Sequence, residues 1–263
     1  MDGELEARIC DGCDHVVVND GGIWQHPDWV SDKFSGAVCE KPAVGRPAKP
    51  GELRFGRGRT VSREDFSHHS ALDDFSGEPG TRLLLATDGS YKKLEGHIRN
   101  RPICWGYVTD RGHYGLGGKT LPPNIAGLPV LQTELRAMWH ALNRFIPRHV
   151  VHLLTDSLDA LELIELWRQG SGQMPPGYTV ERQSQNKATL VQLARLVAAN
   201  ADRISIDKVQ AHTGHALNEG ADALAKIARV WATGRISKQT AHADARTVVR
   251  QTIARQRAGS HGS

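Results

Sequence analysis

From Arg82 onward, apolar runs and polar segments alternate in the pattern of an α/β domain. The runs Arg82–Thr87 (RLLLAT) and Val150–Thr155 (VVHLLT) are short and almost wholly apolar, so they predict buried strands. Two further runs, Ile103–Thr109 and His113–Thr120, flank an Asp-Arg-Gly turn and predict a β-hairpin. Ile204–Val209 (ISIDKV) predicts one more strand.

Between and after these strands, apolar residues recur at helical spacing. Helices are predicted at Leu131–Phe145, Ser157–Trp167, Asn186–Asn200 and Asn218–Thr233, with Ser157 as the N-cap of the second. The order is a strand, a hairpin, a helix, a strand, two helices, a strand and a helix. This order indicates a mixed sheet with helices packed against it.

The segments on either side of this region differ from it in composition. Lys41–Gly80 is rich in proline and glycine and lacks apolar periodicity, so it is interpreted as a linker. The tail from Ile236 predicts a polar, basic helix with a disordered tip. We therefore divide the chain into a small module at 1–40, a linker at 41–80, an α/β domain at 81–234 and a basic extension at 235–263.

Composition removes several classes of protein. A chain of 263 residues that is 39% hydrophobic and 24% charged is not a collagen, a coiled-coil rod or a wholly disordered protein. No apolar run approaches the roughly 20 residues that cross a membrane. The acidic N-terminus lacks the apolar segment of a signal peptide. We expect a cytoplasmic monomer without a membrane partner.

The formal charge of +4 is distributed unevenly along the chain. Residues 1–80 carry 9 basic and 15 acidic side chains, residues 81–234 carry 18 and 13, and residues 235–263 carry 6 and 1. The surplus of basic side chains after residue 80 suits a polyanionic partner such as nucleic acid. The alternative is ordinary solvated charge. In the extension, the candidates for phosphate contact are Arg246, Arg250, Arg255 and Arg257.

Four carboxylates occupy comparable places in the predicted elements. Asp88 and Asp156 each follow a buried strand, so parallel pairing would bring both to the same edge of the sheet. Glu134 and Asp222 lie in the first turns of two helices. If these groups converge, they cannot all stay ionised without cations, and oxygen ligands favour Mg²⁺ or Mn²⁺. Two such ions would clamp the attacking and leaving oxygens of a phosphodiester. The alternative is that each carboxylate caps a loop.

Two histidines lie in the Gly-containing loop before the last of these helices. His212 is ten residues before Asp222 and is a candidate for shuttling protons or aiding product release at a metal site. His215 is interpreted as structural, holding the loop through hydrogen bonds.

Four strings in this order resemble ribonuclease H of type 1: TDGS, TELRAMWHAL, LLTDSLDAL and VQAHTGHALNEGADALA. The resemblance covers about Arg82–Thr233 and implies a ribonuclease H-like fold, a five-stranded mixed sheet flanked by helices. It also implies two-metal endonucleolytic hydrolysis of the RNA strand of RNA–DNA hybrids. The implied metal ligands are Asp88, Glu134, Asp156 and Asp222, and His212 matches the loop histidine of the family.

The resemblance weakens where the family recognises its substrate. Many members place asparagines before the helix glutamate to contact the RNA 2′-hydroxyl, whereas this chain has Val130 to Thr133. Gln132 and Thr133, together with Gly89 and Ser90, are the candidate substrate contacts. At Gly89 the absence of a side chain would allow a substrate backbone to approach Asp88, and a turn glycine is the alternative.

The first 40 residues contain a possible zinc site. A Cys-x2-Cys knuckle before a hairpin is a common beginning of a zinc ribbon, and a metal would stabilise a unit too small for a core of its own. His15 is the rival to His26 as the histidine ligand, and free thiols in a flexible extension are the alternative. Such a module could present Trp24 and Trp29 to a base or to another protein. The favoured ligands are Cys10, Cys13, His26 and Cys39.

Three other functions remain open on these residues. One is a nuclease of the same fold that cuts DNA or structured RNA, and another is a nucleic-acid binding module without catalysis. A third possibility is a partner-recruiting protein that acts mainly through its N-terminal module.

Overall fold

The computed structural model describes most of the α/β region and short pieces of the N-terminal part. The described residues are 7–10, 16–20, 23–25, 44–47, 66–72, 80–91, 101–121, 129–178, 180, 188–210, 213–232 and 235–259. Within them, no helix is long and apolar enough to cross a membrane.

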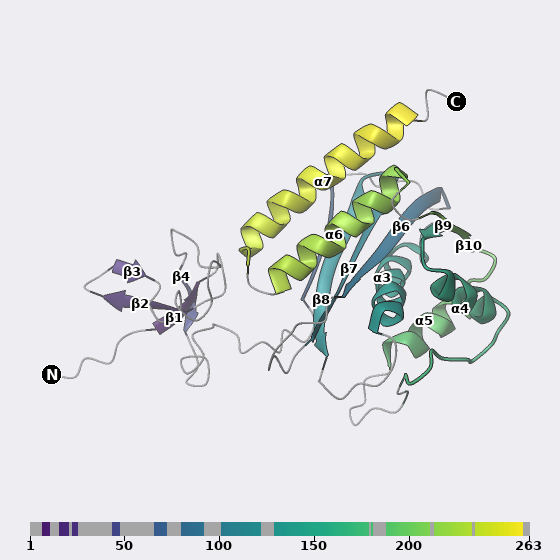
Figure 1. Cartoon of the computed structure of the whole chain (residues 1–263), viewed down its shortest axis with the longest axis horizontal. Coiled ribbons are helices and arrows are strands. Elements are labelled where there is room, and N and C mark those ends of the chain that lie inside the picture. The colour runs from purple at the N-terminus through teal and green to yellow at the C-terminus, as the bar shows by residue number, and fades with distance from the viewer. Residues whose placement is uncertain are drawn as a thin grey trace.

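The α/β domain is built on one mixed sheet (Figure 1), which has six strands within the described residues in the order β10-β9-β6-β7-β8-β5. The central strand β6 pairs in parallel with β9 and antiparallel with β7, and β10 pairs in parallel with β9. The strands are β5 (Phe66–Ala71), β6 (Arg82–Tyr91), β7 (Arg101–Thr109), β8 (His113–Leu121), β9 (Val150–Thr155) and β10 (Ile204–Lys208).

Helices cover both faces of this sheet (Figure 1). Leu83 and Leu85 of β6 join the core beneath α3, α4 and α5, whereas Ala86 joins the core beneath α6 and α7. This division follows from the strand period of two, which sends successive side chains to opposite faces. The helices are α3 (Pro129–Phe145), α4 (Leu158–Arg168), α5 (Thr189–Ala199), α6 (Ala216–Ala232) and α7 (Lys238–Gly259).

Most of the elements predicted from the apolar pattern are confirmed. The strand Val150–Thr155 has the predicted bounds, and the hairpin is formed by β7 and β8. Ser157 caps α4, because its hydroxyl accepts a hydrogen bond from the amide of Ala160 at 3.3 Å. Strand β6 is longer than predicted and runs through Asp88 to Tyr91, because it stays paired with β7 beyond its apolar part.

The sheet has one strand more than the predicted five. The additional strand β5 comes from the segment interpreted as a linker, and it pairs antiparallel with the edge of β8. Its sequence, FSHHSA, has no alternation of apolar and polar residues that would have revealed it. Glycines of β8 make room for the rings around it, since a Cβ at Gly117 or Gly118 would collide with Trp105 or Phe66.

Stacked rings attach β5 to both faces of the domain. His69 stacks on Trp105 and shares a 2.8 Å hydrogen bond between its Nδ1 and the hydroxyl of Tyr107. His68 stacks on His242 of α7 with 3.7 Å between ring centroids. Burial lowers the pKa of His69 and of His242 to about 4, so both rings are neutral at pH 7 and pack as largely apolar groups.

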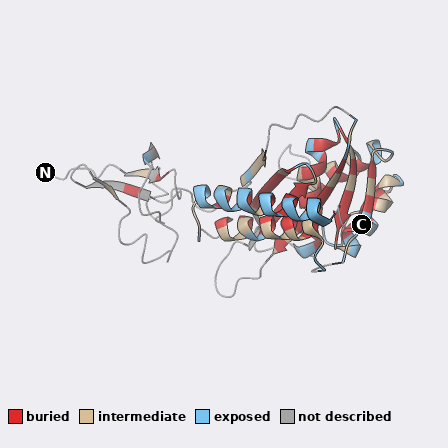
Figure 2. Ribbon diagram, turned by 90° about the horizontal axis from the view of Figure 1, so that it is seen from above, coloured by how far each residue is buried: buried red, intermediate tan, exposed pale blue. Residues whose placement is uncertain are grey.

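The C-terminal tail forms the predicted basic helix, and this helix packs on the domain. One stripe of α7 lies against α6, while the opposite side is exposed to solvent (Figure 2). The buried residues of this stripe are Ala241, Ala245, Val249, Thr252 and Ile253.

Within the described residues, the N-terminal part contains a separate sheet of four strands in the order β3-β2-β1-β4. Cys10 is buried and packs with Val17 and Trp24. The other favoured zinc ligands, Cys13, His26 and Cys39, lie outside the described residues, as does the rival His15, so the zinc site stays a prediction. The strands are β1 (Ala7–Cys10), β2 (Val16–Asp20), β3 (Ile23–Gln25) and β4 (Val44–Pro47).

Close packing of α6 on β7 yields a stability prediction at Gly106. A Cβ there would lie 2.5 Å from the carbonyl oxygen of Ala221 and from the amide of Ala225. We expect Gly106→Ala to lower the free energy of unfolding by about 1–3 kcal/mol, because α6 must move away from the strand. Urea denaturation measures this change.

Gly172 supplies the matched control, because a Cβ there would meet nothing within 4 Å. Gly172→Ala should change the free energy of unfolding by less than about 0.5 kcal/mol. Equal stability of the two variants would contradict the packing described for Gly106.

Candidate active site

Asp88 and Asp156 meet at the edge of the sheet where the predicted strand ends placed them. The parallel pairing of β6 with β9 runs from Arg82 opposite Val150 to Ala86 opposite Leu154. The same register, continued by two residues, brings Asp88 level with Asp156. Because β6 extends to Tyr91, Asp88 lies inside the strand, opposite Gly106 of β7.

Glu134 reaches these two carboxylates from α3. Its Oε2 atom accepts a hydrogen bond from the backbone amide of Gly89 at 3.0 Å, which fixes the carboxylate beside β6. One ligand oxygen from each of Asp88, Glu134 and Asp156 lies within 4.8 Å of the others. The sequence prediction that these three acids converge is therefore confirmed by the geometry.

Gly89 has a packing role in this arrangement. A Cβ at this position would overlap the hydroxyl of Thr133 and lie 2.6 Å from the amide nitrogen of Glu134. The space beside Gly89 is thus occupied by α3, and only glycine allows the helix to bring Glu134 so close to the strand.

Helix α6 contributes two polar residues from its first turns. Asp222 is hydrogen-bonded to Asp88, and its carboxylate also accepts from Lys226 Nζ at 2.6 Å. Asn218, four residues earlier on the same side, donates from Nδ2 to Asp156 Oδ2 at 3.3 Å. The sequence pattern does not single out Asn218 as a functional residue, although its i, i+4 spacing from Asp222 is a signal.

Burial and mutual repulsion favour the protonated forms of the central acids. Burial, and then the charges of Asp222 and Asp156, raise the pKa of Asp88 to about 8. Burial likewise raises the pKa of Glu134 well above its ordinary value, followed by repulsion from Asp88 and Asp156. The amide of Gly89 opposes both shifts by donating to the cluster. Positive charge is needed before these groups can all ionise.

The candidate substrate contacts on α3 are buried. The side chains of Gln132 and Thr133 are 3% and 1% exposed, and Thr133 donates its hydroxyl to the carbonyl oxygen of Val130 at 2.6 Å. Ser90 of β6 is also buried. These residues therefore surround the acidic cluster without offering their side chains broadly to solvent.

The two loop histidines have different outcomes. His215 Nδ1 accepts a hydrogen bond from the amide of Asn218 at 3.4 Å, at the start of α6, which confirms its structural interpretation. His212 lies outside the described residues, so its role stays a prediction.

The comparisons with known proteins identify the family of this domain. The RNase H family matches residues 80–229, which is more than half of the chain. One similar solved structure, LC9-RNase H1, is described as a type 1 RNase H with the type 2 active-site motif. It is 17% identical, with 62% of this chain and 77% of that chain covered, and the TM-score is 0.38. None of the curated proteins compared matches the chain.

The family match includes all four carboxylates, Asp88, Glu134, Asp156 and Asp222. The chain therefore belongs to the RNase H family and is a metal-dependent ribonuclease.

Proposed function

We propose that the chain is an endonuclease that hydrolyses the RNA strand of RNA–DNA hybrids with two Mg²⁺ or Mn²⁺ ions. The observation that carries this proposal is the convergence of Asp88, Glu134 and Asp156 within 4.8 Å, inside the region that matches the RNase H family. Asp222, which is hydrogen-bonded to Asp88, completes the set of acids expected to hold the ions.

The donor set fits hard divalent cations. Carboxylate oxygens are the ligands preferred by Mg²⁺ and Mn²⁺, and the raised pKa values of Asp88 and Glu134 reflect charge that a cation would balance. The Oδ1 atom of Asn218 is a buried acceptor without a partner among the described residues, which suits a site that receives hydrated ions. When bound, such ions supply an activated water and stabilise the charge that develops on the phosphate.

The protein's own groups hold the acids in position for this chemistry. The Gly89 amide orients Glu134, and the Asn218 amide orients Asp156. Lys226 restrains Asp222 at the outer side of the cluster. Because Glu134 is held by a backbone amide, Asp156 by a side-chain amide of α6 and Asp222 by an i, i+4 pair, the acids are preorganised before substrate binds. We further propose that His212 moves protons during hydrolysis or aids product release.

The proposed substrate is the one expected of the RNase H family. The residues at the expected 2′-hydroxyl contacts, however, differ from those of many members. Because Gln132 and Thr133 are buried, their side chains offer little surface for reading the 2′-hydroxyl. We also propose that the N-terminal module binds a structural Zn²⁺ and a protein partner. The protein is proposed to be a monomer.

A cleavage assay on matched duplexes tests the substrate. With Mg²⁺ or Mn²⁺, the protein should cut the RNA strand of an RNA–DNA hybrid and leave RNA–RNA and DNA–DNA duplexes of the same sequence largely intact, since only the hybrid combines the 2′-hydroxyl with a DNA strand. Product ends should be 5′-phosphate and 3′-hydroxyl. Preferential cutting of DNA–DNA or RNA–RNA would replace this proposal with the alternative nuclease, and no cutting of any duplex would favour a binding module.

Removing one ligand tests the acidic site. Asp88→Asn keeps the size of the side chain and removes its charge, so hybrid cleavage should fall by at least about 100-fold. His212→Ala should cost less, because a proton shuttle contributes less than a metal ligand. Asp244→Asn, an exposed carboxylate on α7, is the control and should leave the rate unchanged. Equal losses for Asp88→Asn and His212→Ala would contradict this division of roles.

The repulsion within the cluster predicts that Asp88→Asn, which should lower activity, raises the stability of the metal-free protein. A carboxyl group with a raised pKa holds its proton more tightly when folded, so it costs progressively more stability as pH rises from its ordinary pKa of 3.8 to about 8. In EDTA at pH 8, Asp88→Asn should therefore be more stable than wild type, on the order of 2 kcal/mol or several degrees in Tm.

Thermal melts at two pH values and with Mg²⁺ measure this effect. The advantage of Asp88→Asn should shrink at pH 5, and Mg²⁺ should raise the Tm of the wild type more than that of the variant. A metal-free variant that is no more stable than wild type at pH 8 would refute the repulsion.

A further inference from the structure

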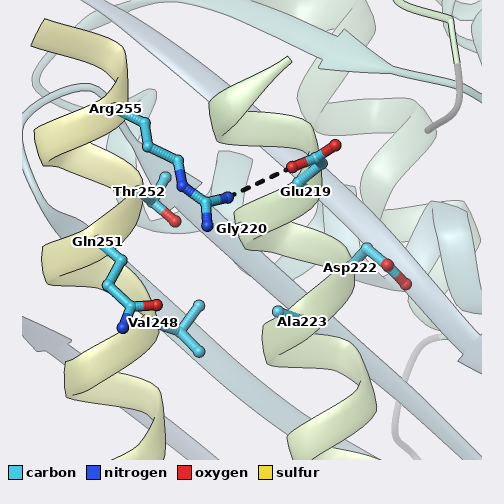
Figure 3. A pocket seen from close by; sticks show the side chains of 8 residues that line it. All are labelled: Glu219, Gly220, Asp222, Ala223, Val248, Gln251, Thr252 and Arg255. Atoms are coloured by element: carbon cyan, nitrogen blue, oxygen red, sulfur yellow. Dashed lines mark hydrogen bonds and ion pairs between the residues drawn. The ribbon is translucent and has the colours of Figure 1, made fainter. Parts of the chain in front are cut away.

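Helix α7 and Asp222 of the acidic cluster line one groove, and the α7 side of this groove lies outside the family match. A cavity of about 300 Å³ lies between α6 and the C-terminal half of α7, and Asp222 is part of its wall. Figure 3 shows Arg255 of α7 extending across this cavity toward Glu219, with Asp222 one turn farther along α6. Helix α7 begins at Lys238, beyond residue 229 where the match ends. The α7 side of the cavity therefore belongs to the chain's own extension.

We propose that Arg255 binds a backbone phosphate of the hybrid beside the cleavage site, which makes α7 part of the substrate surface. This inference rests on the proposed function and adds to it a named contact from outside the family region. The ligand is a phosphodiester group of the bound strand, which a guanidinium recognises through paired N–H donors.

The position of Arg255 is the first argument. Glu219 and Asp222 are i, i+3 neighbours on α6, which places their Cβ atoms about 5–6 Å apart. Arg255 Nη1 lies 3.5 Å from Glu219 Oε2, so the guanidinium is about one helical turn from a carboxylate of the cluster. Phosphates follow one another at about 3.4 Å of axial rise along a strand. A strand that runs from the acids along α6 would therefore have another phosphate within reach of Arg255.

The ion pair between Arg255 and Glu219 is weak, which also favours phosphate binding by Arg255. The side chains of Arg255 and Glu219 are 66% and 37% exposed, and a solvated pair of this kind contributes little to stability. The charge of Asp222 nearby is offset by Lys226 at 2.6 Å. Glu219 therefore positions the guanidinium over the groove while leaving it available to a stronger anion.

The other arginines of α7 face elsewhere. Arg250 is five residues before Arg255, so the two side chains lie about 140° apart around the helix. The buried stripe that contains Val249 and Ile253 lies beside Arg250. By the same spacing, Arg246 and Arg257 lie within about 40° of Arg250. All three are exposed, and none of them lines the cavity. Arg250 is therefore a matched control with the same charge, on the same helix, directed away from the groove.

The experiment compares Arg255→Ala with Arg250→Ala in the full chain, with melting temperature recorded for both. On a hybrid substrate, Arg255→Ala should raise KM about 5-fold or more with little change in kcat, whereas Arg250→Ala should change KM less than 2-fold. In filter binding of the same hybrid, Arg255→Ala should lower the slope of log K against log salt by about 1, as loss of one phosphate contact requires.

Glu219→Gln separates phosphate binding from a structural ion pair. If Arg255 binds phosphate, this variant frees the guanidinium, and KM stays at or below the wild-type value. If Arg255 serves only to hold Glu219, Glu219→Gln raises KM as Arg255→Ala does, which overturns the inference.

Two further results would also overturn it. One is equal behaviour of Arg255→Ala and Arg250→Ala in KM and salt slope, with hybrid cleavage by the wild type intact, which leaves the proposed function standing. The other is a wild type that neither cuts nor binds the hybrid, which removes the proposed function and this inference together.

Discussion

The repulsion between buried carboxylates is the constraint on which the rest of the site depends. Asp88 and Glu134 are 7% and 5% exposed and lie beside Asp156. Burial alone disfavours their charged forms, and proximity adds to the cost. A protein selected only for stability would not keep such a cluster. A metal-dependent ribonuclease, in contrast, needs acids close together in one site, and this cluster supplies them.

Two glycines allow the fold to assemble this cluster from both faces of the sheet. Gly89 follows Asp88 on β6 and admits α3, which carries Glu134. Gly106 lies opposite Asp88 on β7 and admits α6, which carries Asp222. The two helices thus approach the same point of the strand pair from opposite sides. Backbone contacts of this kind are rigid, so the carboxylates are held by packing as much as by hydrogen bonds.

The elements outside the family match extend this core. Strand β5 and helix α7 contact each other through the stacked rings of His68 and His242, and α7 covers α6 with an apolar stripe. Lowered histidine pKa values keep these rings uncharged near neutral pH, so they pack without a desolvation penalty for a cation. The two ends of the described α/β region therefore close on one another, and the basic helix is held next to the acids instead of trailing free.

Periodicity in the chain was sufficient to predict the central strands, the hairpin and the helices, because each buries a face whose spacing is visible locally. The acids could also be chosen in advance, since Asp88 and Asp156 follow apolar runs that end at one sheet edge. Strand β5 could not be predicted, because FSHHSA owes its place to backbone pairing and ring stacking with distant residues. The same holds for Asn218, whose partner Asp156 is 62 residues away in the sequence.

Residue types and spacing thus determined the fold class, the family resemblance and the identity of the acids, since these depend on local burial patterns and on the chemistry of single side chains. Tertiary structure decided which groups touch. It made Gly89 the point where α3 meets β6, buried Gln132 and Thr133, and separated Arg255 from the other arginines of α7. These outcomes arise from long-range packing, in which a side chain's neighbours come from elements far apart in the sequence.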